Sequence, residues 1–411
     1  MARRRIGFGR SVAIGLLALA GFGGVGLGVL AAGAVSPSGS PRSSLALASG
    51  TVATPSPSPS PAPTATATPT ASPTPTPTPS ATPVPTPALV AAPLTGRLVS
   101  KAVAARHAIA VMVDDQRDAR PQSGFNDASI VWQAPAEGGI PRYMLIFQDS
   151  IAPSVGPIRS ARQYYIAWAA EWRAVYAHVG GSPQALQTLR TKGRGQLVYN
   201  ADEFRWGGIY FHRTKDRFAP HNVYSAGKEL VALAKRLGAA NKPMKAAWTF
   251  APDMPPSLRP VGGRISVSYS YNTIAYRYDR ATNTYLRSVT GETKQMDRGR
   301  KAQVAPKNVV VMVMSFGPLN DGSKKHRLEA QYVGKGTAWI STNGKTIKGT
   351  WRKRSITDPT RFYDAKGKPV TLTVGQTFVQ VMPRGAKIVF QAGKPAPLVV
   401  PTFKDLRDQA I

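Results

Sequence analysis

Cysteine is absent from the 411-residue sequence, and its absence removes several classes of chemistry. Disulfide bonds, cysteine ligands for metals, thiol catalysis and lipid attachment through an N-terminal cysteine are all excluded. An exported protein of this composition must therefore be held together by its core alone. Histidine is also scarce, and the five histidines lack the short spacing of a zinc site.

Acidic residues are few compared with basic ones. Aspartate and glutamate number 21 against 53 lysines and arginines, which gives a formal net charge of +32. A surface this basic favours anionic partners, and nucleic acid, lipid headgroups and phosphate-bearing wall polymers all qualify. Charge alone does not choose among these partners, and part of the excess can serve solubility only.

The N-terminus has the features of an export signal. The basic stretch MARRRIGFGR precedes Ser11–Val35, which carries no charge and is rich in Leu, Ala, Gly and Val. A transmembrane helix needs about 20 residues, so this segment is long enough to span, although Ala32-Gly33-Ala34 also fits the cleavage site of a signal peptide. Residues 1–35 are therefore predicted to be a transmembrane anchor or a signal peptide. The arginines before the segment place everything after it outside the cell membrane.

Two further composition changes divide the chain. Residues 36–96 contain repeats such as TPSPSPSPAPTATATPT, cannot bury a core, and are predicted to be a disordered, Pro-rich linker with extended polyproline II character. In residues 97–250, apolar runs alternate with helical patterns, which predicts an α/β domain with a mixed sheet. In residues 262–395, short alternating segments separated by Gly turns predict a smaller, mainly-β domain.

The α/β domain contains the elements that carry the candidate site. Strands are predicted at 108–115, 129–139 and 142–148, the last two as a hairpin, and another at 175–181. Helices are predicted at 159–174, at 226–238, and after Ser182, which has Pro183 at the first helical position. In open α/β sheets ligands bind at the carboxyl ends of strands, so polar residues that follow these strands are the candidates.

The stretch VGPIRSARQYY contains the most specific candidate, because Arg159 and Arg162 flank Ser160 at the expected start of a helix. Ser160 is the predicted N-cap, and a helix N-terminus disfavours arginine unless an anion sits between the cations. Arginine binds phosphate or carboxylate bidentately. The alternative is a pair of solvated arginines. The other predicted ligand-binding residues are Arg142, His178, Ser182, His221 and Asn222.

Acidic residues at the strand ends are candidate metal ligands. Asp114, Asp115 and Glu137 could hold Mg²⁺, which usually takes one or two carboxylates together with substrate phosphates. The alternative, equally open, is that they pair with the many arginines. His178, before Gly180-Gly181, is a candidate general base, but a histidine in a buried strand is more often structural.

Long motifs resemble the YerB-like family of bacterial lipoproteins, whose function is unknown. The first-domain motifs are ARPQSGFNDASIVWQAPAEGGIPRYMLIFQ, VGPIRSAR, YAHVGGSPQAL and APHNVY; the second-domain motifs are NVVVMVM, GKGTAWISTNGKTIKGTWRK and LTVGQTFVQVMP. The resemblance covers residues 108–383 and implies a two-domain, membrane-tethered protein outside the cytoplasm. This sequence departs from the family by lacking the lipid-modified cysteine.

A weaker likeness concerns the order of the motifs. A strand pair, an arginine-bearing PIRS and a Tyr-x-x-x-Gly-Gly before a helix are similar in order to the LytR-Cps-Psr family. That likeness implies transfer of a wall polymer from polyprenyl pyrophosphate with arginines and Mg²⁺. Ser160 stands where that family has an aspartate, which counts against catalysis.

These observations favour an extracytoplasmic, membrane-tethered protein of the cell envelope that binds an anionic, phosphate-bearing polymer or lipid headgroup. The alternative is a Mg-assisted phosphoryl-transfer enzyme acting on a polyprenyl-pyrophosphate-linked wall polymer. A nucleic-acid binder is the least favoured class, because aromatic residues are not interleaved with the basic ones.

Overall fold

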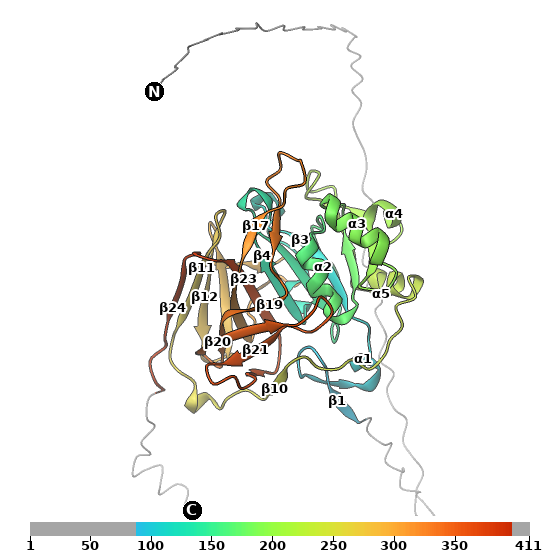
Figure 1. Cartoon of the computed structure of the whole chain (residues 1–411). Helices are drawn as coiled ribbons and strands as arrows, with labels where there is room; N and C mark the ends of the chain where they lie inside the picture. Colours follow the sequence, from blue (N-terminus) through green and yellow to red (C-terminus); the bar gives the residue numbers. More distant parts are fainter. Residues whose placement is uncertain (1–87, 397–411) are drawn as a thin grey trace, which may run out of the picture. The chain divides into compact units, whose positions relative to one another are not determined.

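The computed structural model describes residues 88–396, which belong to one compact unit (Figure 1). The predicted membrane segment, residues 1–35, and most of the predicted linker lie outside the described residues. None of the helices in residues 88–396 is long and apolar enough to cross a membrane.

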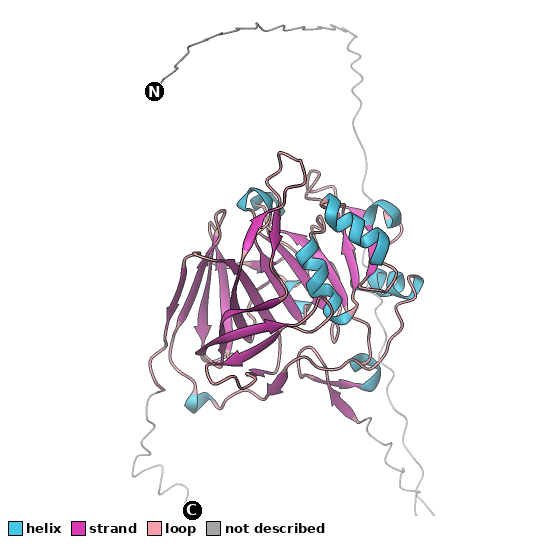
Figure 2. Ribbon diagram, in the orientation of Figure 1, coloured by secondary structure: helices cyan, strands magenta, loops and turns pink. Residues whose placement is uncertain are grey.

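Within residues 88–396, a mixed sheet of ten strands forms the centre of the structure (Figure 2). The strands are β3 (Ile109–Asp114), β4 (Ile130–Ala134), β5 (Arg142–Phe147), β6 (Val175–His178), β7 (Tyr199–Asp202), β16 (Asn308–Met314), β19 (Gly334–Thr342), β20 (Lys345–Lys353), β21 (Arg361–Asp364) and β23 (Thr377–Pro383). Their spatial order is β21-β20-β19-β16-β23-β4-β5-β3-β6-β7. The pairs β16–β23, β23–β4, β3–β6 and β6–β7 are parallel and the others antiparallel.

The sheet joins the two parts of the chain, which the sequence predicted as successive domains. The mixed sheet, the hairpin of β4 and β5, and the mainly-β second part are confirmed. However, β23 pairs in parallel with β4, so the second part does not form a separate β module. The physical reason lies in the apolar runs NVVVMVM and TFVQVM, which fit strands buried on both faces at the middle of a sheet.

A smaller sheet covers one face of the central sheet. It consists of β11 (Arg264–Ser268), β12 (Thr273–Asp279), β13 (Thr284–Val289) and β24 (Ile388–Gln391), in the order β13-β12-β11-β24. Two-stranded ribbons complete the β structure of the described region: β1 (Leu89–Ala91) with β2 (Leu98–Ser100), β8 (His212–Arg213) with β9 (Val223–Tyr224), β10 (Thr249–Ala251) with β22 (Thr371–Thr373), β14 (Met296–Asp297) with β15 (Ala302–Gln303), and β17 (Phe316–Pro318) with β18 (Leu328–Ala330).

The α-helices of the described region are α1 (Lys101–Ala104), α2 (Gln163–Ala169), α3 (Pro183–Lys192), α4 (Glu203–Trp206) and α5 (Gly227–Arg236). Short 3-10 turns are η1 (Arg117–Ala119), η2 (Phe125–Asp127), η3 (Glu137–Gly139), η4 (Ala170–Trp172) and η5 (Pro256–Leu258). The predictions of α3, with Ser182 as N-cap, and of α5 are confirmed. The helix predicted at 159–174 is wrong at its start: α2 begins only at Gln163, because the residues before it pair with strands.

Alternation along the buried strands divides the core between the two faces of the central sheet. Ala110 and Met112 of β3 face a cluster that includes Trp132 and the α2 residue Trp168, whose rings stack at 4.7 Å. The neighbouring valines of β3 face the smaller sheet. Large stacked aromatics dominate the energetics of such cores. The same alternation sends the side chains at the end of β3 to opposite faces, which determines the geometry of the candidate site.

The N-terminal ribbon extends the folded region into the predicted linker. Strands β1 and β2 pair in antiparallel register, and Leu94 and Thr95 between them are buried. The Thr95 hydroxyl donates a hydrogen bond to Asp149 (2.7 Å). The linker expected to end at residue 96 therefore ends before Leu89, because LVAAPL and RLVS supply a hairpin that the Pro-rich composition upstream conceals.

Candidate functional site

The candidate residues gather where the parallel strands β3 and β6 separate at their carboxyl ends. After three paired positions the strands diverge, and residues 156–161 fill the space between them. The backbone N–H of Arg159 donates to the carbonyl of Met112 (2.9 Å), and its own carbonyl accepts from Val179 N–H (3.0 Å). Ligand sites of α/β sheets lie at such carboxyl ends.

The Gly-Pro pair before the arginines is required for packing. Gly156 has φ +151°, and a Cβ there would lie 2.7 Å from the Tyr224 ring and 2.8 Å from the Val223 carbonyl. Since real Cβ contacts do not come this close, only glycine lets the segment lie against β9. Ile158 N–H then donates to the Val223 carbonyl (2.7 Å). Gly156 thus fixes the backbone that presents Arg159.

Asp114, at the end of β3, joins two of the predicted ligand residues. Its Oδ2 lies 2.7 Å from His221 Nδ1 and 2.9 Å from Arg159 Nε. The Nε–H of Arg159 is not directed at the carboxylate and has no acceptor, so this contact is electrostatic and not a hydrogen bond. The Asp114 side chain is only 2% exposed, whereas that of Arg159 is 17% exposed. The carboxylate is thus a buried support beneath partly accessible cations.

Glu137 joins the other two arginines. Arg142 lies directly opposite Asp114 in the β3–β5 pair, and its Nη2 is 3.5 Å from Glu137 Oε1. Arg162 donates from Nε to Glu137 Oε2 (2.7 Å) and forms a second contact through Nη2. These residues lie on adjacent elements of one sheet end, and together with Asp114, Arg159 and His221 they are called the arginine cluster below.

The arginine cluster carries more positive than negative charge. Its three guanidinium groups share two carboxylates, Asp114 and Glu137. The Nε–H groups of Arg142 and Arg159 are buried without an acceptor. Burial lowers the pKa of Arg159, Asp114 opposes this effect, and the neighbouring Arg142 adds to it; burial also lowers the pKa of Arg162. A bound oxyanion would supply the missing acceptors and balance the charge.

The remaining predicted ligand residues have contacts within the fold. His178 is buried, with Nδ1 2.8 Å from the Gly180 carbonyl and Nε2 2.7 Å from Asn200 Oδ1. The Ser182 hydroxyl accepts from Ala185 N–H as the α3 cap (3.3 Å). Asn222 Oδ1 accepts from Arg213 (3.1 Å). These contacts hold the loops in place, so His178 has the environment of a structural histidine.

The prediction that Ser160 caps the helix is wrong. The N-cap position of α2 is Arg162, and it makes no side-chain capping bond. Ser160 lies two residues earlier, in the segment between β3 and β6, and is half-buried. Because α2 has only seven residues, its dipole is not the basis for anion binding. The arginines converge through strand geometry instead.

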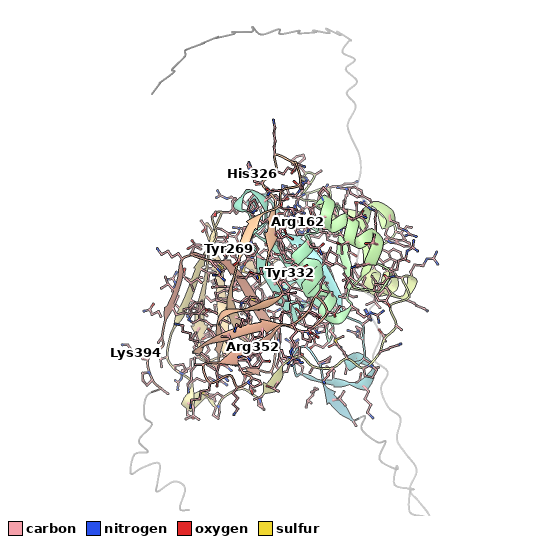
Figure 3. All side chains as sticks on the ribbon, in the orientation of Figure 1. Arg162, Tyr269, His326, Tyr332, Arg352 and Lys394 are labelled. Carbon is pink, nitrogen blue, oxygen red and sulfur yellow. The ribbon has the colours of Figure 1, made fainter. Side chains whose placement is uncertain are left out.

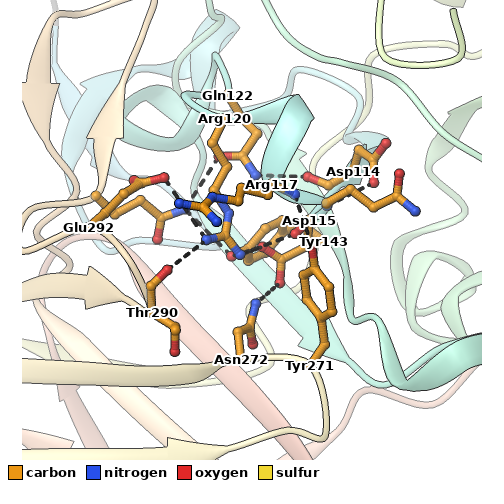
Figure 4. A network of polar contacts seen from close by, with 12 residues as sticks. Asp114, Asp115, Arg117, Arg120, Gln122, Tyr143, Tyr271, Asn272, Thr290 and Glu292 are labelled. Atoms are coloured by element: carbon orange, nitrogen blue, oxygen red, sulfur yellow. Dashed lines mark hydrogen bonds and ion pairs between the residues drawn. The ribbon is translucent and has the colours of Figure 1, made fainter.

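Asp115 belongs to a different group on the opposite face of the sheet (Figure 4). Its Oδ1 accepts from Arg120 (3.1 Å) and Tyr143 (3.0 Å), and its Oδ2 from Gln133 (2.7 Å) and Asn272 (3.0 Å). Burial raises the pKa of Asp115, while Arg120, Asn272 and other partners oppose the rise.

Arg287 completes this group, which is called the buried network below. Its Nη2 donates to Gln133 (2.6 Å) and Tyr143 (3.2 Å), and its guanidinium lies 5.4–5.5 Å from the rings of Tyr143, Tyr276 and Phe378. Arg287 is fully buried between the two sheets. These contacts join the smaller sheet to the central one and leave Asp115 inaccessible to a ligand.

The three predicted metal ligands do not come together. Asp114 contacts Arg159 and His221, Asp115 lies in the buried network, and Glu137 contacts Arg142 and Arg162. Within residues 88–396, no group of three or more His, Cys, Asp or Glu side chains is arranged to hold a metal ion. Ion pairing with arginine, the alternative considered for these acids, is what the structure shows.

Two buried charged residues could not be distinguished in the sequence from ordinary exposed strand positions. Arg287 lies in the alternating strand TYLRSV, and Lys353 in KTIKGTWRK. Both are buried, and Lys353 Nζ lies 2.9 Å from Glu171 Oε1. Among the tyrosines of the second part, Tyr269, Tyr276 and Tyr278 are buried and Tyr271 is 39% exposed.

A central sheet shared by both parts of the folded region and a smaller sheet covering one of its faces define a two-part, β-rich class of protein. Residues 94–240 match the family model described as "Protein of unknown function (DUF3048) N-terminal domain", and residues 265–379 match its C-terminal domain. The chain belongs to this family, as the sequence motifs predicted.

A Bacillus subtilis protein, YerB, agrees with this assignment in both its sequence and its crystal structure. The protein named "Putative lipoprotein YerB" of strain 168 is 30% identical over 299 residues, which make up 71% of this chain and 86% of the relative. A crystal structure of the YerB protein has a TM-score of 0.65 and 26% identity, and the match covers 73% of this chain and 99% of that chain.

Proposed function

We propose that this protein is an extracytoplasmic, membrane-tethered component of the cell envelope that binds a phosphate-bearing anion at the arginine cluster. The relative's description as a lipoprotein supports a location outside the cytoplasm. Since the given sequence has no cysteine for acylation, the uncharged segment Ser11–Val35 is the candidate anchor. The net charge of +32 favours an anionic partner.

The observation that carries the proposal is the imbalance of charge and hydrogen bonding in the cluster. Three arginines share two carboxylates, and the buried Nε–H groups of Arg142 and Arg159 have no acceptor. Buried donors without partners are uncommon in folded proteins and are costly. A phosphate oxygen bound between Arg142 and Arg159 would accept from both, and Glu137 and Asp114 would keep the guanidinium groups in place.

The test is the double substitution Arg142→Gln with Arg159→Gln in the full chain. We expect retention on purified wall material to fall by about tenfold or more, since two charge-assisted contacts are removed. Lys235→Gln with Arg236→Gln, at exposed positions of α5, makes the same change in net charge and is the matched control. Wall material stripped of phosphate and vesicles containing phosphatidylglycerol form separate arms, which distinguish a wall polymer from a lipid headgroup. Equal losses in the two variants contradict the proposal.

A second candidate function is Mg-assisted phosphoryl transfer to or from a polyprenyl-pyrophosphate-linked wall polymer. The observation that favours it is the His221–Asp114 pair: Nδ1 lies 2.7 Å from a buried carboxylate that also contacts Arg159, so the imidazole lies beside a candidate anion-binding guanidinium. In this reaction His221 takes the proton of an acceptor hydroxyl, whose oxygen forms a bond to phosphorus as the pyrophosphate bridge breaks and polyprenyl phosphate leaves. Glu137 would be the protein ligand of a Mg²⁺ ion bound mainly by pyrophosphate oxygens, and it would have to exchange its contacts with Arg142 and Arg162 for the metal.

This candidate is tested with farnesyl pyrophosphate carrying a sugar, which is a short substitute for the polymer carrier. Release of farnesyl phosphate, followed by mass spectrometry, should require Mg²⁺ and fall about a hundredfold or more in His221→Gln, because proton transfer contributes rate factors of that size. Binding without release, or release that His221→Gln leaves unchanged, leaves the protein as a binding module.

A further inference from the structure

A second basic region lies away from the arginine cluster. It is a groove of about 1010 Å³ along the sheet edge formed by β21, and residues of β19, β20 and β21 line it together with Trp248 and its neighbours. The groove and the arginine cluster share no residue. Figure 3 shows its Arg352 apart from Arg162 of the cluster.

Three cations stand in a row across adjacent strands at this groove. Lys335 of β19 lies directly opposite Arg352 of β20, which in turn lies opposite Arg361 of β21. Neighbouring strands are about 4.8 Å apart, and like charges in directly opposite positions destabilise a sheet. Arg354 adds a fourth cation to the lining. An anion bound across the row would neutralise this repulsion, which would account for cations at these opposite positions.

These four cations lack paired carboxylates in the described part of the chain. Within residues 88–396, none of them forms an ion pair, and Lys335, Arg352 and Arg354 are exposed. The carboxylate among the described lining residues is Asp358. The remaining cation of the lining, Lys353, is neutralised by the buried Glu171 at 2.9 Å. The surplus charge of the groove is therefore larger than that of the arginine cluster.

The walls of the groove are fixed by hydrogen bonds, one of which comes from Arg361 itself. Trp248 Nε1 donates to the Thr360 carbonyl (2.8 Å), and Arg361 Nη1 donates to the Ala247 carbonyl (2.7 Å). The Arg352 guanidinium stacks over the Tyr363 ring at 4.4 Å. Stacking orients the guanidinium and leaves its N–H edge available for an oxyanion. The row is thus preorganised for repeated anionic groups.

The lining also distinguishes between classes of polyanion. Nucleic acid needs free aromatic faces for base stacking, but Trp248 and Phe362 are buried and the Tyr363 ring is covered by Arg352. A membrane surface needs exposed apolar side chains to insert, and Val333, at 37%, is the large hydrophobic residue of the described lining that is exposed. A hydrophilic chain with regularly spaced anionic groups needs neither free aromatic faces nor exposed apolar side chains, so the lining is compatible with it.

We propose that the groove binds a linear anionic polysaccharide, whose phosphate or carboxylate groups pair with Lys335, Arg352, Arg354 and Arg361. This binding uses residues separate from the arginine cluster and does not depend on the function proposed for it. A chain long enough to reach both regions would gain affinity from simultaneous attachment, as linked binding sites do.

The experiment compares binding of dextran phosphate with neutral dextran of equal length, using the full chain purified in detergent. We expect Lys335→Gln with Arg352→Gln and Arg354→Gln to weaken binding of dextran phosphate about tenfold or more, since charge-assisted contacts are removed. The matched control, Lys228→Gln with Lys235→Gln and Arg236→Gln on α5, makes the same charge change and should weaken binding less than about twofold. The double variant Arg142→Gln with Arg159→Gln measures how much the arginine cluster contributes to binding of dextran phosphate, separately from the groove.

Three results would overturn the proposal: equal weakening in the groove and control variants, equal binding of neutral dextran, or tighter binding of a single-stranded oligonucleotide than of dextran phosphate. The single charge reversal Arg354→Glu, at an exposed position, provides an independent test that does not depend on the folding of the triple variant. It should weaken dextran phosphate binding in the same direction, and unchanged binding counts against the groove.

Discussion

The arginine cluster and the buried network start from two consecutive residues of one strand end but have different environments. Asp114 points to one face of the central sheet, where His221 and Arg159 contact it near the surface. Asp115 points to the other face, where four donors surround its carboxylate between the two sheets. The alternation of a strand therefore separates an accessible carboxylate–arginine group from an inaccessible one.

The different environments of Asp114 and Asp115 indicate which polar contacts stabilise the fold and which side chains remain available to bind a ligand. Both oxygens of Asp115 are hydrogen-bonded twice, and burial raises the pKa of Tyr143, so its hydroxyl keeps its proton and donates to Asp115. In the arginine cluster, by contrast, the Arg142 and Arg159 side chains are 11% and 17% exposed, whereas Arg120 is 4% exposed and Arg287 is fully buried. We therefore expect substitutions in the buried network to act on stability, and substitutions in the arginine cluster to act on binding.

The largest expected effect is that of Arg287→Ala in the buried network. Removing this fully buried guanidinium leaves Asp115 with one cation fewer and empties the space between three aromatic rings. The free energy of unfolding, measured by urea denaturation, should fall by about 3–5 kcal/mol. The control Arg277→Ala, at an exposed position of the adjacent strand β12, should change it by less than about 0.5 kcal/mol. A loss of similar size in both variants would show that Arg287 has no special role.

The buried ion pair of Lys353 and Glu171 lies outside both groups. It tests whether burial alone determines how much stability is lost when a charged side chain is removed. Lys353→Met should lower the free energy of unfolding by about 3 kcal/mol, because it leaves Glu171 charged and buried. Adding Glu171→Gln should recover at least about 1 kcal/mol, since no uncompensated charge then remains. Urea denaturation of the two variants gives both values. If the double variant is less stable than Lys353→Met, the hydrogen bonds from Thr360 to Glu171 outweigh the ion pair.

The double variant Arg142→Gln with Arg159→Gln tests the arginine cluster, as Arg287→Ala tests the buried network. Both side chains are partly exposed, and their removal relieves repulsion between neighbouring cations. The free energy of unfolding should therefore change by less than about 1 kcal/mol, in either direction, while binding of the anion is lost. A loss of stability as large as that of Arg287→Ala would mean that the arginine cluster, too, is structural.

The sequence predicted most local elements but not how they assemble. The hairpin of β4 and β5, the capping of α3 by Ser182 and the amphipathic α5 follow from turn residues and periodicity. The pairing of β23 with β4 could not be predicted, because an apolar run indicates a buried strand without indicating its neighbours.

The structure brings some of the predicted site residues together and separates others, for similar physical reasons. Arg142, Arg159 and His221 meet because strand ends converge, as expected. Ser160 was misassigned because its segment pairs with two strands instead of starting a helix. The row Lys335–Arg352–Arg361 depends on the register of three strands, and no spacing in the sequence encodes that register.

The smallest expected effect concerns pH and the protonation of Asp115. Burial raises its pKa in the folded state, although Arg120, Asn272 and Arg287 oppose the rise, so the folded protein binds this proton more tightly than the unfolded chain. The contribution of Asp115 to stability is then fully present below the unfolded pKa of about 3.9 and decreases as the pH rises through the folded pKa. Asp115→Asn lacks this titration, so its stability relative to the natural protein should increase with pH, by about 1 kcal/mol for each unit of the shift. Urea denaturation of both proteins between acidic and neutral pH measures the difference. If Asp115→Asn instead loses stability as the pH rises, Asp115 is ionised in the fold, and the buried network resembles the arginine cluster in being held by charge.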